Sequence, residues 1–394
     1  MKRDPCGFLK AEYQELVDKS FNWQLRTLEG PSAPRAKVEG RKVIVLCSNN
    51  YLNLSNHPKL KEAAKKAVDS HGAGSGSVRA IAGNMDLHLQ LEKKIAEFKH
   101  REAALYYQTG FAANAGLLPQ LVGEGDAVLT DELNHGSIID GLRLTKAKRA
   151  IYPHNDLAGL ESALKQADAE KARRIMIVSD GVFSMDGDLA RAPDICRLAE
   201  DFGAMTYFDD AHGEGVLGGG RGIGTHFNVE GKIHVEMGTF SKAFGVVGGL
   251  IAGSQGLVNF AYNKSRTWLL SGSAPPATAA ACMAALDVLE KEPEHVKRLW
   301  ENTAYFKKEM QGMGFDCGHS ETPITPVMLG ESALAKKMSE RMFQEGVFAL
   351  PIVFPMVAKD KARIRTIMNA GLTKDDLNEA LRAFEKVGKE LKAI

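Results

Sequence analysis

Three short polar segments of the chain carry side chains that can do chemistry. They are DGVFSMDGD at residues 180–188, DDAHG at residues 209–213 and TFSK at residues 239–242. Each follows an apolar run that predicts a short buried strand. Binding and catalytic sites form at the carboxyl ends of parallel strands, which lie along one edge of a sheet. We therefore expect the aspartates, the histidine and the lysine of these segments to meet at one edge.

An acid, a lysine and an anion-binding turn at one edge would suit pyridoxal phosphate (PLP). That cofactor needs a lysine for a Schiff base and an acid that keeps its pyridine nitrogen protonated. Lys242 and Asp209 could fill these two roles, and Lys242 is flanked by small and apolar residues that are a poor setting for a surface lysine. Thr109, Gly110 and Phe111 open a predicted helix, where free N–H groups and the helix dipole favour a phosphate.

Each of these residues also has an ordinary structural interpretation. Lysines are most often solvated at the surface, and an aspartate that follows a strand most often caps a helix. His212 could be a hydrogen-bonded histidine of the core, and Thr109 and Gly110 an ordinary turn. Spacing alone leaves the cofactor and the structural interpretations open.

Two competing sites have weaker support. Residues 213–218 read GEGVLG and match G-x-G-x-x-G, the pattern of a nicotinamide-dependent oxidoreductase, but glycines at 219, 220, 222 and 224 continue the run. The dinucleotide pattern requires a helix at that place. Asp209 and His212 have no third metal ligand at an obvious spacing, so we expect no metal site.

The polar segments need a framework of alternating strands and helices to bring them together. Strands are predicted at residues 103–107, 127–130, 149–152, 175–178, 204–208 and 233–237, and helices at residues 87–98, 157–167, 193–202 and 277–290. This alternation predicts an α/β fold with a parallel sheet covered on both faces. We expect an N-terminal helix and strand segment (1–55), a large domain (56–290) and a small C-terminal α+β domain (291–394).

Composition argues against several classes of protein. The 394 residues include 50 Lys and Arg against 49 Asp and Glu, a net charge of +1, which argues against a polybasic nucleic-acid binder. The five cysteines form no C-x-x-C pair, which favours a reducing compartment. The longest uncharged stretch, residues 267–286, contains two prolines and is no membrane span. No apolar run follows the charged residues 1–5, so we expect a cytoplasmic protein without a signal peptide.

Several longer motifs occur together in this chain. They are SNNYL (48–52), GSG (74–76), LNH (133–135), GVFSMDGD (181–188), DDAHG (209–213) and TFSK (239–242). In this order they resemble the α-oxoamine synthases, a PLP-dependent group with the aspartate-aminotransferase-like fold (fold type I), over residues 8–392. Segments 135–146 and 326–331 resemble the glycine C-acetyltransferase branch more than the 8-amino-7-oxononanoate synthase branch.

The resemblance implies a role for each residue around the cofactor. Lys242 would hold PLP as a Schiff base, His135 would stack on the pyridine ring, and Asp209 would pair with the ring N–H. Ser184 and His212 would bond to the ring hydroxyl.

The phosphate and the substrate would be held by further residues. The turn at 109–111 would bind the phosphate, helped by Thr239. Ser271 and Ser273 would reach it from a second subunit, which implies a homodimer with shared sites. Asn49 and Arg365 would hold the carboxylate of the amino acid, Arg365 through its two-pronged guanidinium.

The reaction implied is the condensation of an amino acid with an acyl-CoA. We expect glycine and acetyl-CoA to give 2-amino-3-oxobutanoate and CoA, as in threonine catabolism, with Lys242 as the general base that removes a Cα proton. The alternative is L-alanine with a pimeloyl thioester, or a longer acyl donor. No nucleic acid and no membrane is expected as a partner.

At three places the chain departs from the family pattern. Gly371 stands where the family usually has a histidine, Gly272 where it has a threonine, and Asn53 where it commonly has a glycine. The cofactor expectation does not depend on these positions.

Overall fold

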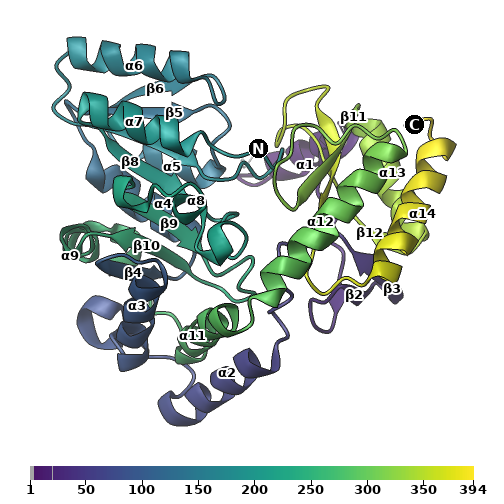
Figure 1. Ribbon diagram of the computed structural model, residues 1–394, viewed down its shortest axis with the longest axis horizontal. Coiled ribbons are helices and arrows are strands. Elements are labelled where there is room, and N and C mark those ends of the chain that lie inside the picture. The colour runs from purple at the N-terminus through teal and green to yellow at the C-terminus, as the bar shows by residue number, and fades with distance from the viewer. Residues whose placement is uncertain (1–3, 20) are drawn as a thin grey trace.

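The computed structural model describes residues 4–19 and 21–394. Residues 1–3, which begin the charged N-terminal segment, lie outside the described part. The chain folds into two lobes, with the central sheet and its helices in the lobe on the left of Figure 1 and the C-terminal part from residue 294, together with N-terminal strands, in the lobe on the right.

A seven-stranded sheet forms the centre of the larger lobe. Its strand order is β4-β10-β9-β8-β7-β5-β6. The strands are β4 (Ala103–Tyr107), β5 (Ala127–Asp131), β6 (Lys148–Tyr152), β7 (Ile175–Asp180), β8 (Met205–Asp209), β9 (Val235–Thr239) and β10 (Gly249–Gly253). The pairs among β5 to β9 are parallel, whereas β10 is antiparallel to both of its neighbours. The predicted α/β class with a mostly parallel sheet is therefore confirmed.

Strand β10 was not expected from the sequence. It is short and begins and ends in glycine, a residue that weakens a strand and usually indicates a turn. The structure explains the first of these glycines, because a Cβ on Gly249 would lie 2.2 Å from the carbonyl oxygen of Thr109. Close approach to the turn before α4, and not strand propensity, therefore requires glycine here.

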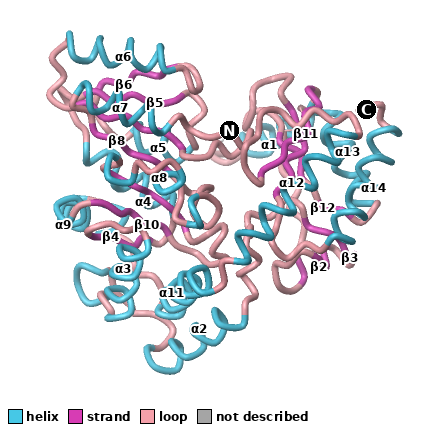
Figure 2. Tube along the Cα trace, in the orientation of Figure 1, coloured by secondary structure: helices cyan, strands magenta, loops and turns pink. Residues whose placement is uncertain are grey.

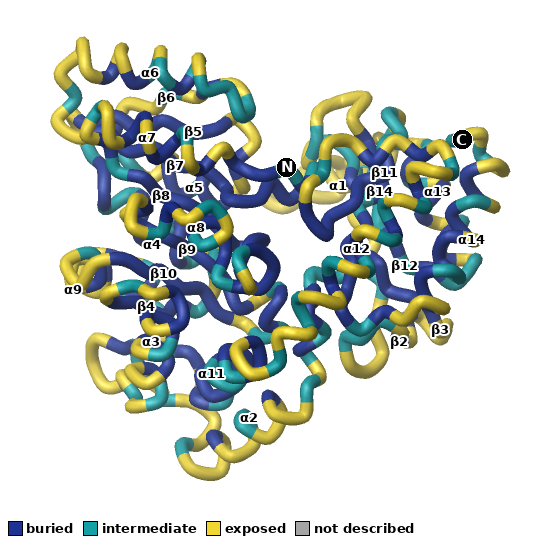
Figure 3. Tube along the Cα trace, in the orientation of Figure 1, coloured by how far each residue is buried: buried dark blue, intermediate teal, exposed yellow. Residues whose placement is uncertain are grey.

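Both faces of this sheet are buried. On β7, Ile175 and Ile177 contact one hydrophobic cluster, while Met176 and Val178 contact another. Alternate residues of a strand point to opposite faces, so a strand with apolar residues throughout needs cover on both sides. Figure 2 shows helices flanking the sheet, and Figure 3 shows its strands as the most deeply buried part of the lobe.

The helices of this lobe mostly begin where the sequence predicts. They are α2 (Pro58–His71), α3 (Asp86–Phe98), α4 (Gly110–Leu121), α5 (Gly136–Arg143), α6 (Leu157–Ala169), α7 (Ala192–Phe202), α8 (Ile223–His226), α9 (Gln255–Lys264), α10 (Arg266–Leu269) and α11 (Pro276–Lys291). The glycine run after residue 218 forms a 3-10 turn and the four-residue α8. It lacks the long helix that a dinucleotide site needs.

The second lobe combines both ends of the chain. One sheet has the order β1-β2-β3-β12 and another the order β11-β14-β13. The strands are β1 (Leu28–Glu29), β2 (Arg35–Val38), β3 (Arg41–Val45), β11 (Ile324–Gly330), β12 (Val347–Phe348), β13 (Leu350–Ile352) and β14 (Ala362–Ile367), and the helices are α1 (Phe8–Asp18), α12 (Glu294–Gly312), α13 (Ser332–Gln344) and α14 (Lys374–Glu390). Because β3 pairs with β12, the N-terminal strands share a sheet with the C-terminal part. The domain boundaries at residues 55 and 290 remain predictions.

Two elements of this lobe differ from expectation. Apolar spacing predicts a helix over residues 8–28, but the N-terminal helix ends at Asp18, ten residues earlier. Residues 347–351, predicted as one strand, form β12 and β13, which pair with β3 and with β14 respectively. Within the described residues, no helix is both long and apolar enough to cross a membrane.

Candidate active site

One pocket in the larger lobe collects the three polar segments predicted to meet. Its volume is about 190 Å³. It is lined by Thr109, Gly110, Phe111, His135, Ser137, Asp180, Val182, Ser184, Asp209, Ala211, His212, Met237, Thr239, Ser241 and Lys242. These residues follow strands β4, β5, β7, β8 and β9, so the pocket lies at the carboxyl edge of the parallel strands, as the sheet rule requires.

Lys242 enters the pocket from the turn after β9. Phe240 and Phe244, both fully buried, hold this turn on either side of the lysine, and the amide of Gly245 donates to the Lys242 carbonyl at 3.0 Å. Burial lowers the pKa of the Lys242 amine to about 8, although the nearby Asp209 and Asp180 oppose the shift. A lysine with this pKa is partly neutral near neutral pH, and the neutral amine is the form that attacks a carbonyl or takes a proton.

Asp209 stands at the end of β8 and is held on both carboxylate oxygens. Its Oδ2 accepts from the Asn114 side chain at 2.6 Å, and its Oδ1 accepts from the Ala211 amide at 3.1 Å. Asn114 is in turn fixed by the Tyr207 hydroxyl, which donates to Asn114 Oδ1 at 2.7 Å. The fixed carboxylate lines the pocket and can accept a hydrogen bond from a protonated ring nitrogen.

Asn114 was missed by sequence reasoning. It lies in the small-residue helix α4 and is completely buried. Its presence among apolar residues on a buried helix face was the available signal, because a buried amide needs hydrogen-bond partners.

The start of α4 offers donors for an anion. Thr109 is the N-cap, and its hydroxyl accepts from the Ala112 amide at 3.0 Å. The amides of Gly110 and Phe111 belong to the first helical turn, where no intrahelical acceptor exists. A Cβ on Gly110 would lie 2.9 Å from the Met237 side chain, so glycine lets the helix start pack closely on β9. These amides and the helix dipole fit the phosphate of PLP.

Thr239 lines the same part of the pocket with its hydroxyl already engaged. It donates to the Gly248 carbonyl at 2.6 Å and accepts from the Ser241 amide at 3.2 Å. The Thr239 side chain therefore fixes the turn that carries Lys242, and its hydroxyl hydrogen is used in the bond to the Gly248 carbonyl.

His135 caps α5 at the opposite wall. Its Nδ1 lies 2.7 Å from the Ser137 hydroxyl, and its backbone amide donates to Asp180 at 3.1 Å. Burial lowers the pKa of His135, opposed by Asp209. A neutral imidazole fixed in this way presents a flat aromatic face that can stack on a ring.

Arg365 and Asn49 adjoin the pocket from the second lobe. The Arg365 guanidinium donates to the Ser184 carbonyl at 3.0 Å and lies 3.5 Å from the Asn49 side-chain oxygen. Burial lowers the pKa of Arg365 from its very high ordinary value, and the group keeps its charge. The two residues expected to hold a carboxylate thus lie together, beside Ser184 of the pocket wall.

Ser271 and Ser273 are not brought to this pocket within one chain. The Ser273 hydroxyl lies 2.5 Å from that of Ser75, and its amide donates to the Ser77 carbonyl. Gly272 forms a bridge with Val78. Neither Ser271 nor Ser273 lines the pocket of its own chain.

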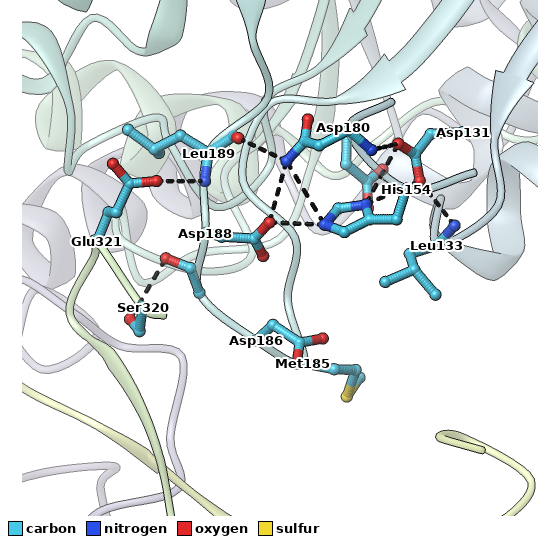
Figure 4. A network of polar contacts seen from close by, with 12 residues as sticks. Asp131, Leu133, His154, Asp180, Met185, Asp186, Asp188, Leu189, Ser320 and Glu321 are labelled. Carbon is cyan, nitrogen blue, oxygen red and sulfur yellow. Dashed lines mark hydrogen bonds and ion pairs between the residues drawn. The ribbon is translucent and has the colours of Figure 1, made fainter. Parts of the chain in front are cut away.

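His154 was also missed, and it joins two of the loops that form the pocket (Figure 4). Its Nδ1 lies 3.0 Å from Asp131 and its Nε2 lies 2.7 Å from Asp188. Burial alone would lower the pKa of His154, but the two carboxylates more than reverse this and raise it to about 10. The charged ring therefore links the segment before His135 to the segment that carries Ser184. Its place just after β6, at the same sheet edge, was the signal that sequence reasoning could have used.

The pocket fits PLP on observations of the chain itself. A lysine with a lowered pKa, a fixed carboxylate, a stacking imidazole and a helix start with free amides surround one small cavity. These are the groups that the aldehyde, ring nitrogen, ring face and phosphate of this cofactor require.

Comparison with known proteins agrees with this fit. The family described as aminotransferase class I and II matches residues 41–384. The chain is 53% identical to the 8-amino-7-oxononanoate synthase of Symbiobacterium thermophilum, over 98% of this chain and 99% of that one. It is 50% identical to 8-amino-7-oxononanoate synthase 1 of Bacillus subtilis, over 98% of both chains.

A solved structure resembles the whole chain. Serine palmitoyltransferase of S. paucimobilis, with a bound PLP–myriocin aldimine, superimposes with a TM-score of 0.94 at 28% identity and covers 100% of both chains. Fold type I, expected from the sequence, is thereby confirmed, and so is PLP as the cofactor.

The expected branch is corrected by these comparisons. They do not support glycine C-acetyltransferase or a place in threonine catabolism, because the full-length relatives at about 50% identity are 8-amino-7-oxononanoate synthases. The two segments that suggested the other branch are short and lie outside most of the pocket lining, so they say little about substrate choice. The chain belongs to the class I and II aminotransferase family and, within it, to the PLP-dependent α-oxoamine synthases.

Proposed function

We propose that the protein is an 8-amino-7-oxononanoate synthase, which joins L-alanine to a pimeloyl thioester and releases coenzyme A. The observation that carries this proposal is the identity of 53% to a synthase of that name along nearly the whole chain. A nine-carbon product from a three-carbon and a seven-carbon substrate requires that one carbon leave as CO₂. The same pocket must therefore support both C–C bond formation and loss of a carboxylate.

Different side chains of the protein serve different parts of this reaction. When bound, PLP supplies an electron sink for the negative charge that develops at the amino-acid Cα. Lys242, with its pKa lowered to about 8, is placed to take a proton from Cα as a general base. Asp209, held in place by Asn114, would accept a hydrogen bond from the protonated ring nitrogen.

Substrate placement falls to the residues from the second lobe. Arg365 offers two parallel N–H groups to the amino-acid carboxylate, and Asn49 beside it adds a polar contact. His135 lines one side of the pocket and would offer its ring face to the cofactor. The α4 start would hold the phosphate through its free amides.

A substrate panel tests the proposal. Purified holoenzyme is given alanine or glycine with pimeloyl-CoA or acetyl-CoA, and both thiol release and product mass are measured. We expect kcat/KM to be highest for alanine with pimeloyl-CoA, with a product that has lost CO₂. Faster release with glycine and acetyl-CoA would overturn the proposal in favour of the branch first expected from the sequence.

We also propose a homodimer in which each site is completed by the partner. Exposed apolar side chains around the pocket and on nearby helices support a covered surface, namely Ile81, Phe111, Leu133, Ile139 and Leu270. The separation of Ser271 and Ser273 from the pocket of their own chain supports the sharing. Sedimentation at micromolar concentration is expected to show a dimer, and an active monomer would refute this proposal.

A further inference from the structure

Tyr51 and His212 form a buried hydrogen bond beside the pocket. Tyr51 Oη lies 2.7 Å from His212 Nδ1, and the two side chains meet edge to face. Tyr51 is 1% exposed and lies in the turn after β3, far from His212 in the sequence. His212 lines the pocket, and no residue in the described part of the chain forms a hydrogen bond with its Nε2.

The direction of this hydrogen bond follows from the charge state of both groups. Burial raises the pKa of the Tyr51 phenol, so its hydroxyl keeps its hydrogen. Burial, together with the positive charges of Lys242 and Arg365, lowers the pKa of His212, so the imidazole is neutral and carries one hydrogen. Only two arrangements remain, with the hydrogen of the imidazole on Nδ1 or on Nε2.

The first arrangement leaves a buried hydrogen without an acceptor. If Nδ1–H donated to Tyr51, the tyrosine hydroxyl hydrogen would need another acceptor, and the described residues provide it with no second hydrogen bond. An unsatisfied buried donor is costly. If Tyr51 donates to Nδ1, both atoms of this contact are satisfied and the imidazole hydrogen lies on Nε2, where His212 lines the pocket and a bound group can accept it.

We propose that Tyr51 is a positioning residue that holds His212 in the tautomer with hydrogen on Nε2, so that His212 always offers a donor to the pocket. A donor there stabilises the ionised ring hydroxyl of PLP over the neutral one. The inference rests on the role proposed for His212 at that hydroxyl and is independent of which acyl donor the enzyme uses.

Tyr51 is itself held from the second lobe. Its backbone carbonyl accepts from the Ala370 amide at 2.7 Å, just beyond β14. The turn that contains Tyr51, which packs against the C-terminal part of the chain, therefore determines which nitrogen of His212 carries the hydrogen. Strand β8, which His212 follows, does not determine it by itself.

The first measurement uses the enzyme without cofactor. Nitrogen-15 NMR of histidine-labelled protein, with the His212 signal assigned through His212→Gln, reports which ring nitrogen carries hydrogen. We expect a protonated Nε2 and an unprotonated Nδ1 in the unchanged protein. A protonated Nδ1 would overturn the proposal, whatever the substrate of the enzyme proves to be.

The second measurement uses the holoenzyme of Tyr51→Phe, which keeps the ring and removes only the donor. A neutral hydrogen bond of ordinary strength shifts an equilibrium by about fivefold. We therefore expect the intensity ratio of the long-wavelength absorption band to the near-ultraviolet band of the bound cofactor to fall about fivefold. The pH at which one band is half converted into the other should rise. An unchanged ratio and midpoint would refute the role.

Two controls separate this role from simple loss of packing. Tyr152 on β6 is also buried, and its hydroxyl donates no hydrogen bond to the residues that the structure describes, so Tyr152→Phe should leave both bands unchanged. In a His212→Gln background the amide nitrogen of glutamine can donate without help from Tyr51, so adding Tyr51→Phe should change nothing further. A full fivefold effect in that background would show that Tyr51 acts by another route.

Discussion

Asn53 and Gly371 face each other across the junction of the N-terminal and C-terminal segments. A Cβ placed on Gly371 would lie 2.4 Å from the Asn53 side-chain nitrogen and 2.8 Å from Pro34. Asn53 itself has a φ of +60°, a conformation that glycine adopts most easily. The chain thus departs from its family at two positions in contact, with the larger residue at one and the smaller at the other.

This contact predicts a coupled effect on stability. Gly371→Ala should lower the free energy of unfolding by about 2 kcal/mol, because the new methyl overpacks a filled space. Adding Asn53→Gly should restore part of the lost stability. The contact of the new methyl with Pro34 should account for the part that is not restored. Urea unfolding of the two single variants and the double variant gives the coupling, and strictly additive effects would contradict the contact.

The covalent role of Lys242 can be tested directly. Hydride reduction of the holoenzyme followed by peptide mass analysis should place the cofactor on Lys242. Lys242→Ala should fold, since burial and nearby charges, and no hydrogen bond among the described residues, act on the amine, and it should lose turnover. An adduct at another lysine would exclude the assignment.

The lowered pKa of Lys242 predicts a pH dependence for the enzyme without cofactor. Burial disfavours the charged ammonium, so half of the amine is neutral at about pH 8. Reductive methylation of Lys242, followed by mass spectrometry, should rise with pH around a midpoint near 8. A midpoint near that of ordinary surface lysines would show that the pocket does not desolvate the amine.

Two adjacent aspartates should respond differently to the same substitution. Asp209→Asn removes the charge that balances the protonated ring nitrogen, and turnover should fall at least about 100-fold while PLP still binds. Burial raises the pKa of Asp210, which favours its neutral carboxyl, although Lys99 opposes this, and its Oδ2 accepts from the Ile223 amide at 2.6 Å. Asp210→Asn keeps an uncharged acceptor and should retain near-normal turnover, and equal loss in both variants would contradict the distinction.

The His154 bridge predicts a pH-dependent contribution to stability. Its folded pKa of about 10 exceeds the ordinary value of 6.5, so the contribution is full below about pH 6.5 and is lost as pH rises through 10. His154→Gln should cost about 2 kcal/mol of unfolding free energy near pH 6 and much less above pH 10. A pH-independent cost would mean that the ring is not charged in the folded protein.

The sheet edge and its clusters could be predicted because they depend on local patterns. Buried strands such as β7 are short apolar runs, and the polar residue that ends each run falls at the carboxyl edge by topology. The hydrogen-bond partners of Asn114 and the Tyr51–His212 pair could not be predicted, because the partners are distant in the sequence and no periodicity indicates them. Strand β10 was missed because its terminal glycines serve close packing, Gly249 against the turn at Thr109 and Gly253 against the His234 carbonyl.

The choice of substrate was misjudged for a related reason. Segments 135–146 and 326–331 suggested glycine and acetyl-CoA, yet neither contains Arg365 or Asn49, which adjoin the pocket from the second lobe. Acyl length and side-chain preference depend on how such segments pack together. A few short motifs therefore identify the cofactor better than the substrate.

The pairing of β3 with β12 has a consequence for how the protein is made. A ribosome releases Asn49 and Tyr51 early, but the strand that covers β3 and the strand that carries Arg365 emerge near the end of synthesis. Until then β3 keeps an open edge that can pair with another nascent chain. Chains cut short before residue 347 should therefore aggregate instead of persisting as an inert half-enzyme.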